Sequence, residues 1–361
     1  MCDVDENQLK PAAAEVEKLS GDRPRKYKDF REMLSREKPE ICIVGTPDHW
    51  HPLVAIEAIR NGAHVYVEKP VAHTVMEGRA MVSAARAAAR VVQVGTQNRS
   101  NSLYIKARDM VKQGMIGEVH YVRAFWYRNS LEDNPAWRYE IPKDATEQNT
   151  DWKRFLGPAK QRAYDARRFY QWRLYSDYSS GISTDLLVHQ TDITNFVCNK
   201  TEPLSCAASG GVYRWTAAND DREVADCMSA IYEYPGKFHI NYSCYFGNEN
   251  FGYGEQFMGN EGTLEVLNRQ QLYFTPEKFR GNAPPHVKAR EPQKIEMPGN
   301  DNKAVEAHLR NLLEAIQGKA QLTTPPKMGQ QAAIGGHLAT MSLKTGKKVL
   351  WDERTQKYRF S

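Results

Sequence analysis

The chain has 361 residues, more than the roughly 250–300 at which a single hydrophobic core stops growing, so we expect two domains. Hydrophobic residues make up 41% and charged residues 26%, and no apolar run approaches the roughly 20 residues of a membrane helix, so a soluble globular protein is expected. The formal charge of +5 arises from 49 basic and 44 acidic residues that are interspersed, which argues against a nucleic-acid-binding protein.

The first hundred residues alternate between short apolar strands and helices. The strands are β-branched runs such as ICIVG at 41–45, which are typical of strands buried on both faces. Asn61 and Gly62 supply a left-handed cap to the first helix, and Thr74 with Glu77 forms a capping-box pattern before the second. The predicted strands are residues 41–45, 64–67 and 91–95, and the predicted helices are residues 51–62 and 74–89. This order predicts a parallel, doubly wound sheet.

Three loops follow the carboxyl ends of these strands. They have the sequences Thr46-Pro47-Asp48, Glu68-Lys69-Pro70 and Gly95-Thr96-Gln97. Because the carboxyl ends of parallel strands meet at one edge of a sheet, where ligands bind in a crevice, we expect the three loops to converge there.

From about residue 118 the pattern changes to longer strands, rich in aromatic residues and joined by turns, which is typical of an antiparallel sheet. A helix is predicted at 183–198, and two more, at 303–317 and 326–346, close the chain. The expected fold class is therefore α/β plus α+β, with a parallel-sheet domain at 1–117 and an open, mostly antiparallel sheet within 118–361. We expect the terminal helices to pack back on the first domain. The predicted strands of the second sheet include residues 118–129, 223–235, 237–247 and 262–268, and residues 280–293 are expected to form a surface loop.

One combination of residues could deprotonate an alcohol. Asp185, His189 and Asp192 share one face of the helix predicted at 183–198. A carboxylate beside an imidazole orients a general base, and Lys69 at the crevice edge could polarise the hydroxyl oxygen. The alternative is a structural pair of Asp185 and His189 with a solvated Lys69, and spacing alone does not separate the two.

Several segments resemble the Gfo/Idh/MocA oxidoreductases, the family of glucose–fructose oxidoreductase and inositol dehydrogenase. They are TPDHWH at 46–51, YVEKP at 66–70, GMIGEVHYVRAFW at 114–126, GISTDLLVHQTD at 181–192 and GNEGTLEV at 259–266. The resemblance implies an N-terminal Rossmann domain that binds NAD or NADP and a C-terminal α/β domain, acting on sugars, inositols or related polyols. It also implies a homo-oligomer, a dimer or tetramer, formed through the C-terminal sheet, and no nucleic-acid or membrane partner.

The resemblance also assigns roles to individual residues. The lysine of the EKP motif falls on Lys69, and the Asp and His of the D-x-x-x-H motif fall on Asp185 and His189. His189 would be the acid/base on the reacting hydroxyl, Asp185 would orient it or bind the substrate, and Lys69 would polarise the same oxygen. The cofactor-binding residues would be Asp3, Thr46, Pro47, His51, Glu68, Lys69 and Gln97, and the substrate-binding residues Lys69, Asn98, Arg99, Trp126, Arg173, Asp185 and His189.

Some of these positions have a packing alternative. His49 and His51 could equally cap and pack a helix, and no metal site is expected from this H-x-H pair because no other residues have ligand spacing. Aromatic residues between 125 and 175, Trp126 among them, would suit a carbohydrate pocket but also sheet packing or a subunit interface.

The family's G-x-G-x-x-G turn, which brings backbone N–H groups to the cofactor's pyrophosphate, has no counterpart in this sequence. Residues 2–9, CDVDENQL, look like the end of a second strand, on which Asp3 would hold the adenosine ribose and favour NAD over NADP. We therefore expect a truncated Rossmann domain that lacks its first strand, Gly-rich turn and first helix.

The leading hypothesis is an NAD(P)-dependent oxidoreductase that transfers hydride between nicotinamide and a hydroxyl-bearing carbon of a sugar, inositol or sugar derivative. Two alternatives stay open: an NAD-dependent glycoside-cleaving enzyme that uses transient oxidation and elimination, and a non-catalytic sugar-sensing homologue. A cytoplasmic location is expected from six scattered cysteines without a C-x-x-C pair, which read as buried thiols: Cys2, Cys42, Cys198, Cys206, Cys227 and Cys244.

Overall fold

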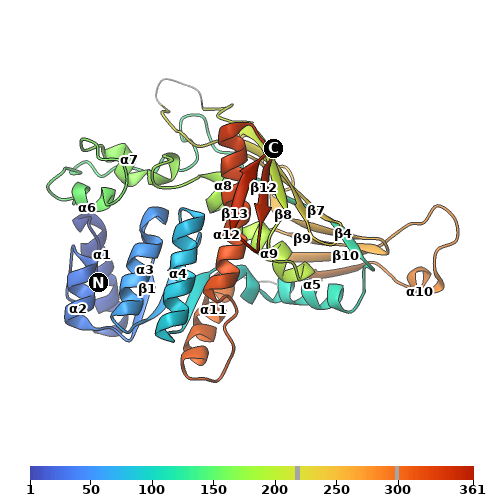
Figure 1. Ribbon diagram of the computed structural model, residues 1–361, viewed down its shortest axis with the longest axis horizontal. Helices are drawn as coiled ribbons and strands as arrows, with labels where there is room; N and C mark the ends of the chain where they lie inside the picture. The colour runs from blue at the N-terminus through green and yellow to red at the C-terminus, as the bar shows by residue number, and fades with distance from the viewer. Residues whose placement is uncertain (216–219, 297–300) are drawn as a thin grey trace.

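The computed structural model describes residues 1–215, 220–296 and 301–361. Figure 1 shows two parts side by side, with the N-terminal helices around a small sheet on the left and a large sheet on the right. The long helix α12 (Pro326–Thr345) runs between them. The predicted order of a parallel-sheet domain and a larger, mostly antiparallel domain is confirmed.

The small sheet has the predicted parallel strands, in the order β1 (Ile41–Val44), β2 (His64–Glu68) and β3 (Val92–Gly95). Between them lie α3 (His51–Arg60) and α4 (Val75–Ala88). The predicted capping box is present: the Thr74 side chain accepts from the Glu77 N–H, and the Glu77 carboxylate accepts from the Thr74 N–H. Gly62 has a φ of 89°, the left-handed conformation that was predicted for the end of the first helix.

The N-terminal segment lies beside the segment around residue 27. Cys2 forms an isolated parallel bridge with Tyr27, and the Asp5 carboxylate caps α1 (Glu6–Ser20) by accepting from the Asn7 N–H. The helix α2 (Phe30–Glu37) and the short η1 (Asp48–Trp50) follow. Where a strand end was expected at the start of the chain, the structure has two isolated bridges, Cys2 with Tyr27 and Asp5 with Thr150, followed at once by a helix.

The large sheet has the order β11-β10-β9-β8-β4-β7-β6-β5-β12-β13, and its pairings are antiparallel except for β4 with β7. Its strands are β4 (Val119–Tyr127), β5 (Ser205–Gly211), β6 (Cys227–Tyr234), β7 (Phe238–Tyr245), β8 (Tyr253–Gly259), β9 (Gly262–Leu267), β10 (Gln271–Pro276), β11 (Gln293–Glu296), β12 (Val349–Asp352) and β13 (Lys357–Phe360).

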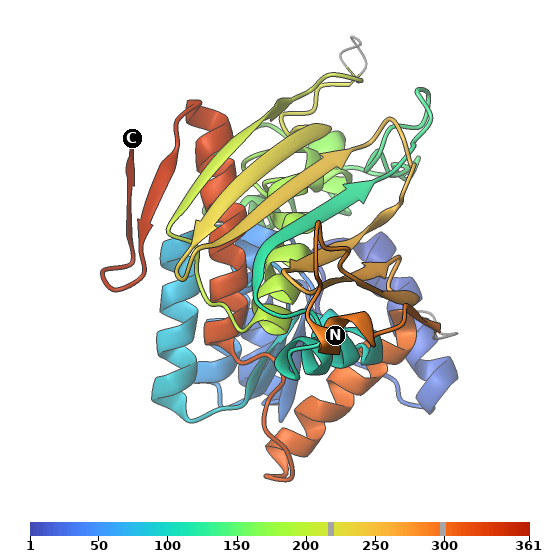
Figure 2. The ribbon, with the colours of Figure 1, turned by 90° about the vertical axis from the view of Figure 1, so that its right-hand side faces the viewer.

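Helices cover one face of this sheet and leave the other uncovered (Figure 2). Strands β6 and β7 alternate between buried and more exposed residues, as a sheet with one solvated face does. The remaining helices are α5 (Ser102–Lys112), α6 (Trp152–Leu156), α7 (Ala166–Tyr170), α8 (Ile182–Asp185), α9 (Leu187–Cys198), α10 (Pro285–Lys288), α11 (Asp301–Ile316) and the short η2 (Gln97–Ser100) and η3 (Trp172–Leu174).

Two predicted elements differ from the structure. The single helix expected at 183–198 is interrupted at Leu186, whose backbone (φ −110°, ψ −54°) separates α8 from α9. The surface loop expected at 280–293 contains the one-turn helix α10, which starts at Pro285, where proline's fixed φ suits a first turn.

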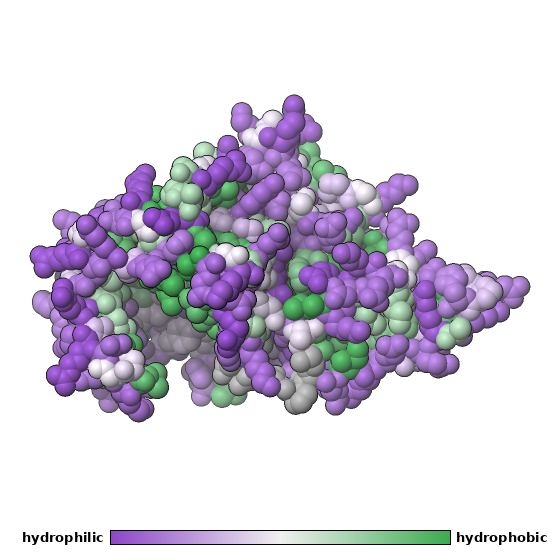
Figure 3. All heavy atoms as spheres, turned by 90° about the horizontal axis from the view of Figure 1, so that it is seen from below, coloured by the Kyte–Doolittle hydropathy of each residue, from purple (hydrophilic) through white to green (hydrophobic). Residues whose placement is uncertain are grey.

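The helix α12 contacts both parts of the molecule. The helix α12 packs on α4 and β3 of the small sheet, and on α8, α9 and β5 of the second part. Within the described residues no helix is long and apolar enough to cross a membrane, and hydrophilic side chains cover most of the face seen in Figure 3.

Gly336 allows α12 to approach α8 closely. A Cβ at this position would lie 2.5 Å from the Ser183 carbonyl oxygen and 2.9 Å from Val188 Cγ2. We predict that Gly336→Ala lowers the free energy of unfolding by about 1–3 kcal/mol, because backbone must move to admit the methyl group. Urea denaturation measures this loss. Gly45→Ala, where a Cβ meets nothing within 4 Å, is the matched control and should change stability by less than about 0.5 kcal/mol.

Candidate active site

Lys69, at the carboxyl end of β2, reaches the second domain at Asp185. Its Nζ donates to the Asp185 main-chain carbonyl at 2.7 Å and to Oδ1 of the carboxylate at 2.8 Å. Because α8 ends at Asp185, this carbonyl lies at a helix terminus and is available to an outside donor. The two side chains are only 13% and 16% exposed, so the structure joins residues 116 positions apart in a largely dry contact.

Asp185 is held in its ionised form. Burial by itself would raise the pKa of this carboxyl, but the charges of Lys69 and Arg173 outweigh it and hold the pKa well below its usual range. Nε of Arg173 lies 3.4 Å from the same Oδ1. A fixed negative charge therefore faces two cations at this point.

His189 lies in the first turn of α9. The residue is 6% exposed, its Nδ1 lies 3.5 Å from Nδ2 of Asn98, and its ring centroid lies 6.0 Å from that of Trp126. Burial, followed by the charges of Lys69 and Arg269, lowers the pKa of His189 well below its ordinary value, although Asp185 opposes this. The imidazole is therefore neutral at neutral pH and able to accept a proton.

Asp48, for which the sequence analysis proposed no role, is a second buried acid at this edge. Its Oδ2 accepts hydrogen bonds from Ser179 Oγ at 2.9 Å and from Thr184 Oγ1 at 3.3 Å. Burial, reinforced by the charge of Asp185, raises the pKa of Asp48 to about 6. Its place directly after a strand end was a usable signal, but nothing in the sequence shows that residues 179–184 lie opposite.

The predicted cofactor loops do converge at one edge. His51 ties two of them together, since Nε2 lies 2.7 Å from the Thr46 carbonyl oxygen and Nδ1 lies 2.7 Å from that of Pro70. It is therefore packed between loops, as the alternative for this residue proposed. His49 is packed as well, with Nε2 at 2.9 Å from the Phe155 carbonyl oxygen.

The residues present at this edge suit a polar ligand. Thr46 Oγ1 and Gln97 Oε1 are buried and have no hydrogen-bond partner within the described parts of the chain. Gly95 leaves room where a Cβ would lie 2.8 Å from Glu68 Oε2. Hydroxyl and amide groups that lack partners, beside a glycine, fit the ribose and amide groups of a nicotinamide cofactor.

The hydrogen bond of the Asp3 side chain is to a neighbouring residue and not to these loops. Its Oδ1 accepts the Asp5 N–H at 2.8 Å, and burial raises the pKa of its carboxyl. Pro47 directly precedes η1, and its side chain is a hydrocarbon ring that cannot form a hydrogen bond.

Arg99 does not face the cluster of Lys69, Asp185 and His189. Its Nε lies 2.8 Å from Oδ1 of Asp192, and the two side chains are 7% and 0% exposed. This buried ion pair joins η2 to α9. The two carboxylates expected on one helical face therefore bind different cations: Asp185 binds Lys69, and Asp192 binds Arg99.

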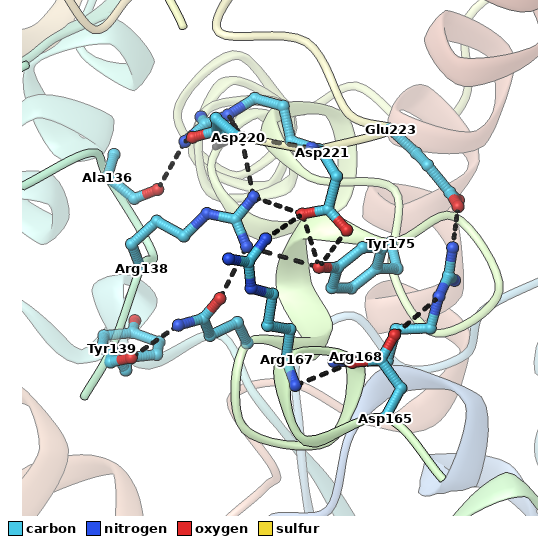
Figure 4. Close-up of polar contacts among 12 residues, drawn as sticks. Ala136, Arg138, Tyr139, Asp165, Arg167, Arg168, Tyr175, Asp220, Asp221 and Glu223 are labelled. Carbon is cyan, nitrogen blue, oxygen red and sulfur yellow. Dashed lines mark hydrogen bonds and ion pairs between the residues drawn. The ribbon is translucent and has the colours of Figure 1, made fainter. Parts of the chain in front are cut away.

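The aromatic set that was considered for a carbohydrate pocket is mostly structural. Trp126 lies beside His189, whereas Trp137 packs edge-on against Phe246 in the core. Arg138 enters an ion-pair network with Asp220 and Asp221 that also holds Tyr175 (Figure 4). That network holds Gln171 and Tyr175 on either side of η3, so it supports the position of Arg173 beside Asp185.

Comparison with known proteins agrees with this architecture. Residues 2–96 match the GFO_IDH_MocA model, described as an oxidoreductase family with an NAD-binding Rossmann fold. Residues 108–350 match the model of the family's C-terminal alpha/beta domain. Because the first match begins at residue 2, it gives no support to the expected loss of an N-terminal unit.

Related sequences and structures were also found. A glycosyl hydrolase family 109 protein of Shewanella putrefaciens is 30% identical over 123 residues, 33% of this chain and 27% of that protein. The chain thus spans about a quarter of the length of such curated relatives. An oxidoreductase domain protein from Kribbella flavida has a TM-score of 0.73 and 20% identity, covering 96% of this chain and 88% of that one. An inositol dehydrogenase homologue from Azotobacter vinelandii, complexed with NADH and myo-inositol, has a TM-score of 0.72 and 16% identity, covering 97% and 88%. At these identities the structural likeness is one of fold.

Asp48 should make stability depend on pH. Its pKa in the folded chain, about 6, exceeds the ordinary value of 3.8, so the folded state binds the proton more tightly and loses stability as the pH rises from about 4 to about 6. We predict that Asp48→Asn, compared with wild type, stabilises the chain by about 1–3 kcal/mol at pH 7 and has little effect at pH 4. Urea unfolding at the two pH values measures this, and an equal effect at both would contradict it.

Arg99 should act through stability rather than through a ligand. We predict that Arg99→Met lowers the free energy of unfolding by about 3 kcal/mol, because it leaves the Asp192 carboxyl buried without its partner. Arg108→Met is a matched control, since both guanidinium groups lie over the Phe196 ring but Arg108 is 38% exposed. Denaturant unfolding compares the two, and an equal loss in both would be inconsistent with this role.

Proposed function

Because the chain belongs to the Gfo/Idh/MocA oxidoreductase family, which has an NAD-binding Rossmann fold, we propose that it transfers hydride between NAD and a hydroxyl-bearing carbon of a sugar, inositol or sugar derivative. The observation that carries this proposal is the contact of Lys69 with Asp185, one turn before a neutral, buried His189. An ammonium and a proton acceptor beside one another suit the oxidation of an alcohol.

Each of the three residues has a proposed part. The neutral imidazole of His189 takes the hydroxyl proton as the C–H hydride leaves. The Lys69 ammonium donates to the same oxygen and stabilises the negative charge that develops on it. Asp185 keeps Lys69 in place and partly balances its charge. In the reverse direction His189 returns the proton.

The cofactor residues proposed are Asp3, Thr46, Pro47, Glu68, Lys69 and Gln97, with His51 holding two of their loops. When bound, NAD supplies the nicotinamide carbon that accepts or returns the hydride. Thr46 and Gln97 offer side-chain atoms that lack partners within the described chain. The acidic Asp3 suits a ribose hydroxyl better than a phosphate, so NAD is proposed over NADP.

A second candidate function is glycoside cleavage through transient oxidation. The curated relatives in the glycosyl hydrolase family 109 favour it, although they match only about a third of this chain. The two functions differ in product, because a dehydrogenase accumulates NADH and a glycoside-cleaving enzyme releases the aglycone without net redox change. A sugar sensor would do neither.

We also propose self-association through the uncovered face of the large sheet (Figure 2). This face carries stacked side chains such as Tyr121 with His239, 5.6 Å apart, and an exposed Ile231. A cytoplasmic location is proposed as well, since all six cysteines are free thiols.

His189→Gln should reduce the rate of NADH formation with a sugar substrate by at least about 100-fold, because it removes the proton acceptor. The dissociation constant of NAD, measured by calorimetry, should change less than about threefold. His120→Gln, at an exposed position on β4, is the matched control and should keep both values.

Wild-type turnover unchanged by His189→Gln would overturn the role of His189. Assays with p-nitrophenyl glycosides separate the candidate functions: release of p-nitrophenol without NADH would replace the dehydrogenase with the glycoside-cleaving enzyme. Neither product from any sugar, with sugar binding retained, would favour a sensor.

A further inference from the structure

The wall of the site opposite Lys69 is built from aromatic rings and arginines. In β4, side chains of alternate residues share a face, so Arg123 and Trp126 point to opposite sides, and Arg128 directly follows the strand. The guanidinium carbon of Arg128 lies 5.1 Å from the Trp126 ring centroid, and that of Arg269 lies at the same distance. Tyr253 stacks on Trp126 at 4.6 Å.

This wall adjoins the candidate catalytic base. The helix α9, which carries His189, contacts β4 and β8, and the Trp126 and His189 rings are 6.0 Å apart. Lys69, Arg269 and Arg128 all act on His189 electrostatically by disfavouring its protonation, and Asp185 is the carboxylate that opposes them. The imidazole therefore sits in a region of positive potential.

Cationic side chains outnumber carboxylates among the charged groups that act most strongly on His189. Lys69 and Arg173 share the single carboxylate of Asp185. Arg128 stacks on Trp126, and among the described residues no carboxylate forms an ion pair with it. Glu255 on β8 accepts a hydrogen bond from the Tyr104 hydroxyl at 2.7 Å, and burial raises the pKa of its carboxyl to about 7.

We infer that this site takes an anionic sugar derivative, one with a carboxylate or phosphate group, and that Arg128 selects it. The inference rests on the proposed function and narrows its substrate class. The Arg128 guanidinium lies over the Trp126 ring, and a guanidinium carries five N–H donors that can bond a carboxylate or phosphate. Charge-assisted bonds of this kind are about twice as strong as neutral ones, so an anion gains more here than a hydroxyl group does.

The test compares matched sugars by calorimetry on the NAD-saturated full chain. D-Glucuronate and D-galacturonate carry a carboxylate where D-glucose and D-galactose carry a hydroxymethyl group, and glucose 6-phosphate supplies the phosphate. We expect at least one anionic sugar to bind about tenfold or more tightly than its neutral counterpart. Arg128→Gln should reduce this ratio to about twofold or less, whereas Arg128→Lys, which keeps the charge, should retain most of it.

Arg123→Gln is the matched control, because it removes an arginine of β4 on the face opposite to Trp126, and it should leave the ratio unchanged. Ratios below about threefold for all the anionic sugars, no binding of any of them, or a preference that survives Arg128→Gln would each overturn the inference. In those cases Arg128 only packs on Trp126.

The outcomes also separate this inference from the proposed function. Reduction of NAD by neutral sugars alone, without a charge preference, overturns the inference and leaves the proposed function standing. Tight binding of anionic sugars through Arg128 without NADH formation supports the inference and overturns the proposed function.

Discussion

The ion pair of Lys69 and Asp185 is the contact on which the site depends. Removing two charges from water is costly unless each finds good partners, and here the ammonium has two acceptors and the carboxylate has two cations. The pair joins the end of a strand in one domain to a helix end in the other. It therefore fixes the relation of the two domains at the point where the candidate base lies.

Other contacts hold α8 and α9, the helices that carry Asp185 and His189, in place. The glycine at 336 lets α12 lie against α8, while the buried pair of Arg99 and Asp192 ties α9 to η2. Asp48 adds a second link, from the strand-end loop to Ser179 and Thr184 just ahead of Asp185. Two of these contacts hold Ser183 and Thr184 of α8, and the third holds α9.

Much of this could be predicted from the sequence, for physical reasons. Parallel strands place their following loops at one edge, so the location of Lys69 followed from strand order alone, and its meeting with Asp185 followed from the family resemblance. Long-range partners carry no local signal. The link from Asp48 to Ser179 and the approach of Arg269 to Trp126 both join segments more than 100 positions apart, and the break at Leu186 gave no sign in the residue pattern. Arg128, two residues after Trp126, was within reach of a strand-alternation argument. The domain boundary at 117 and 118 and the roles of the site residues stay predictions.

Because the helix is interrupted at Leu186, the main-chain oxygen of Asp185 is available to Lys69. One of the two acceptors of the ammonium is the peptide oxygen of residue 185, which every amino acid at that position would supply. Replacing the Asp185 side chain with a neutral one would therefore remove its negative charge but leave Lys69 a hydrogen bond to the main chain. In an evolving lineage, the electrostatics of the cleft could drift at this position while its geometry is conserved by the main chain.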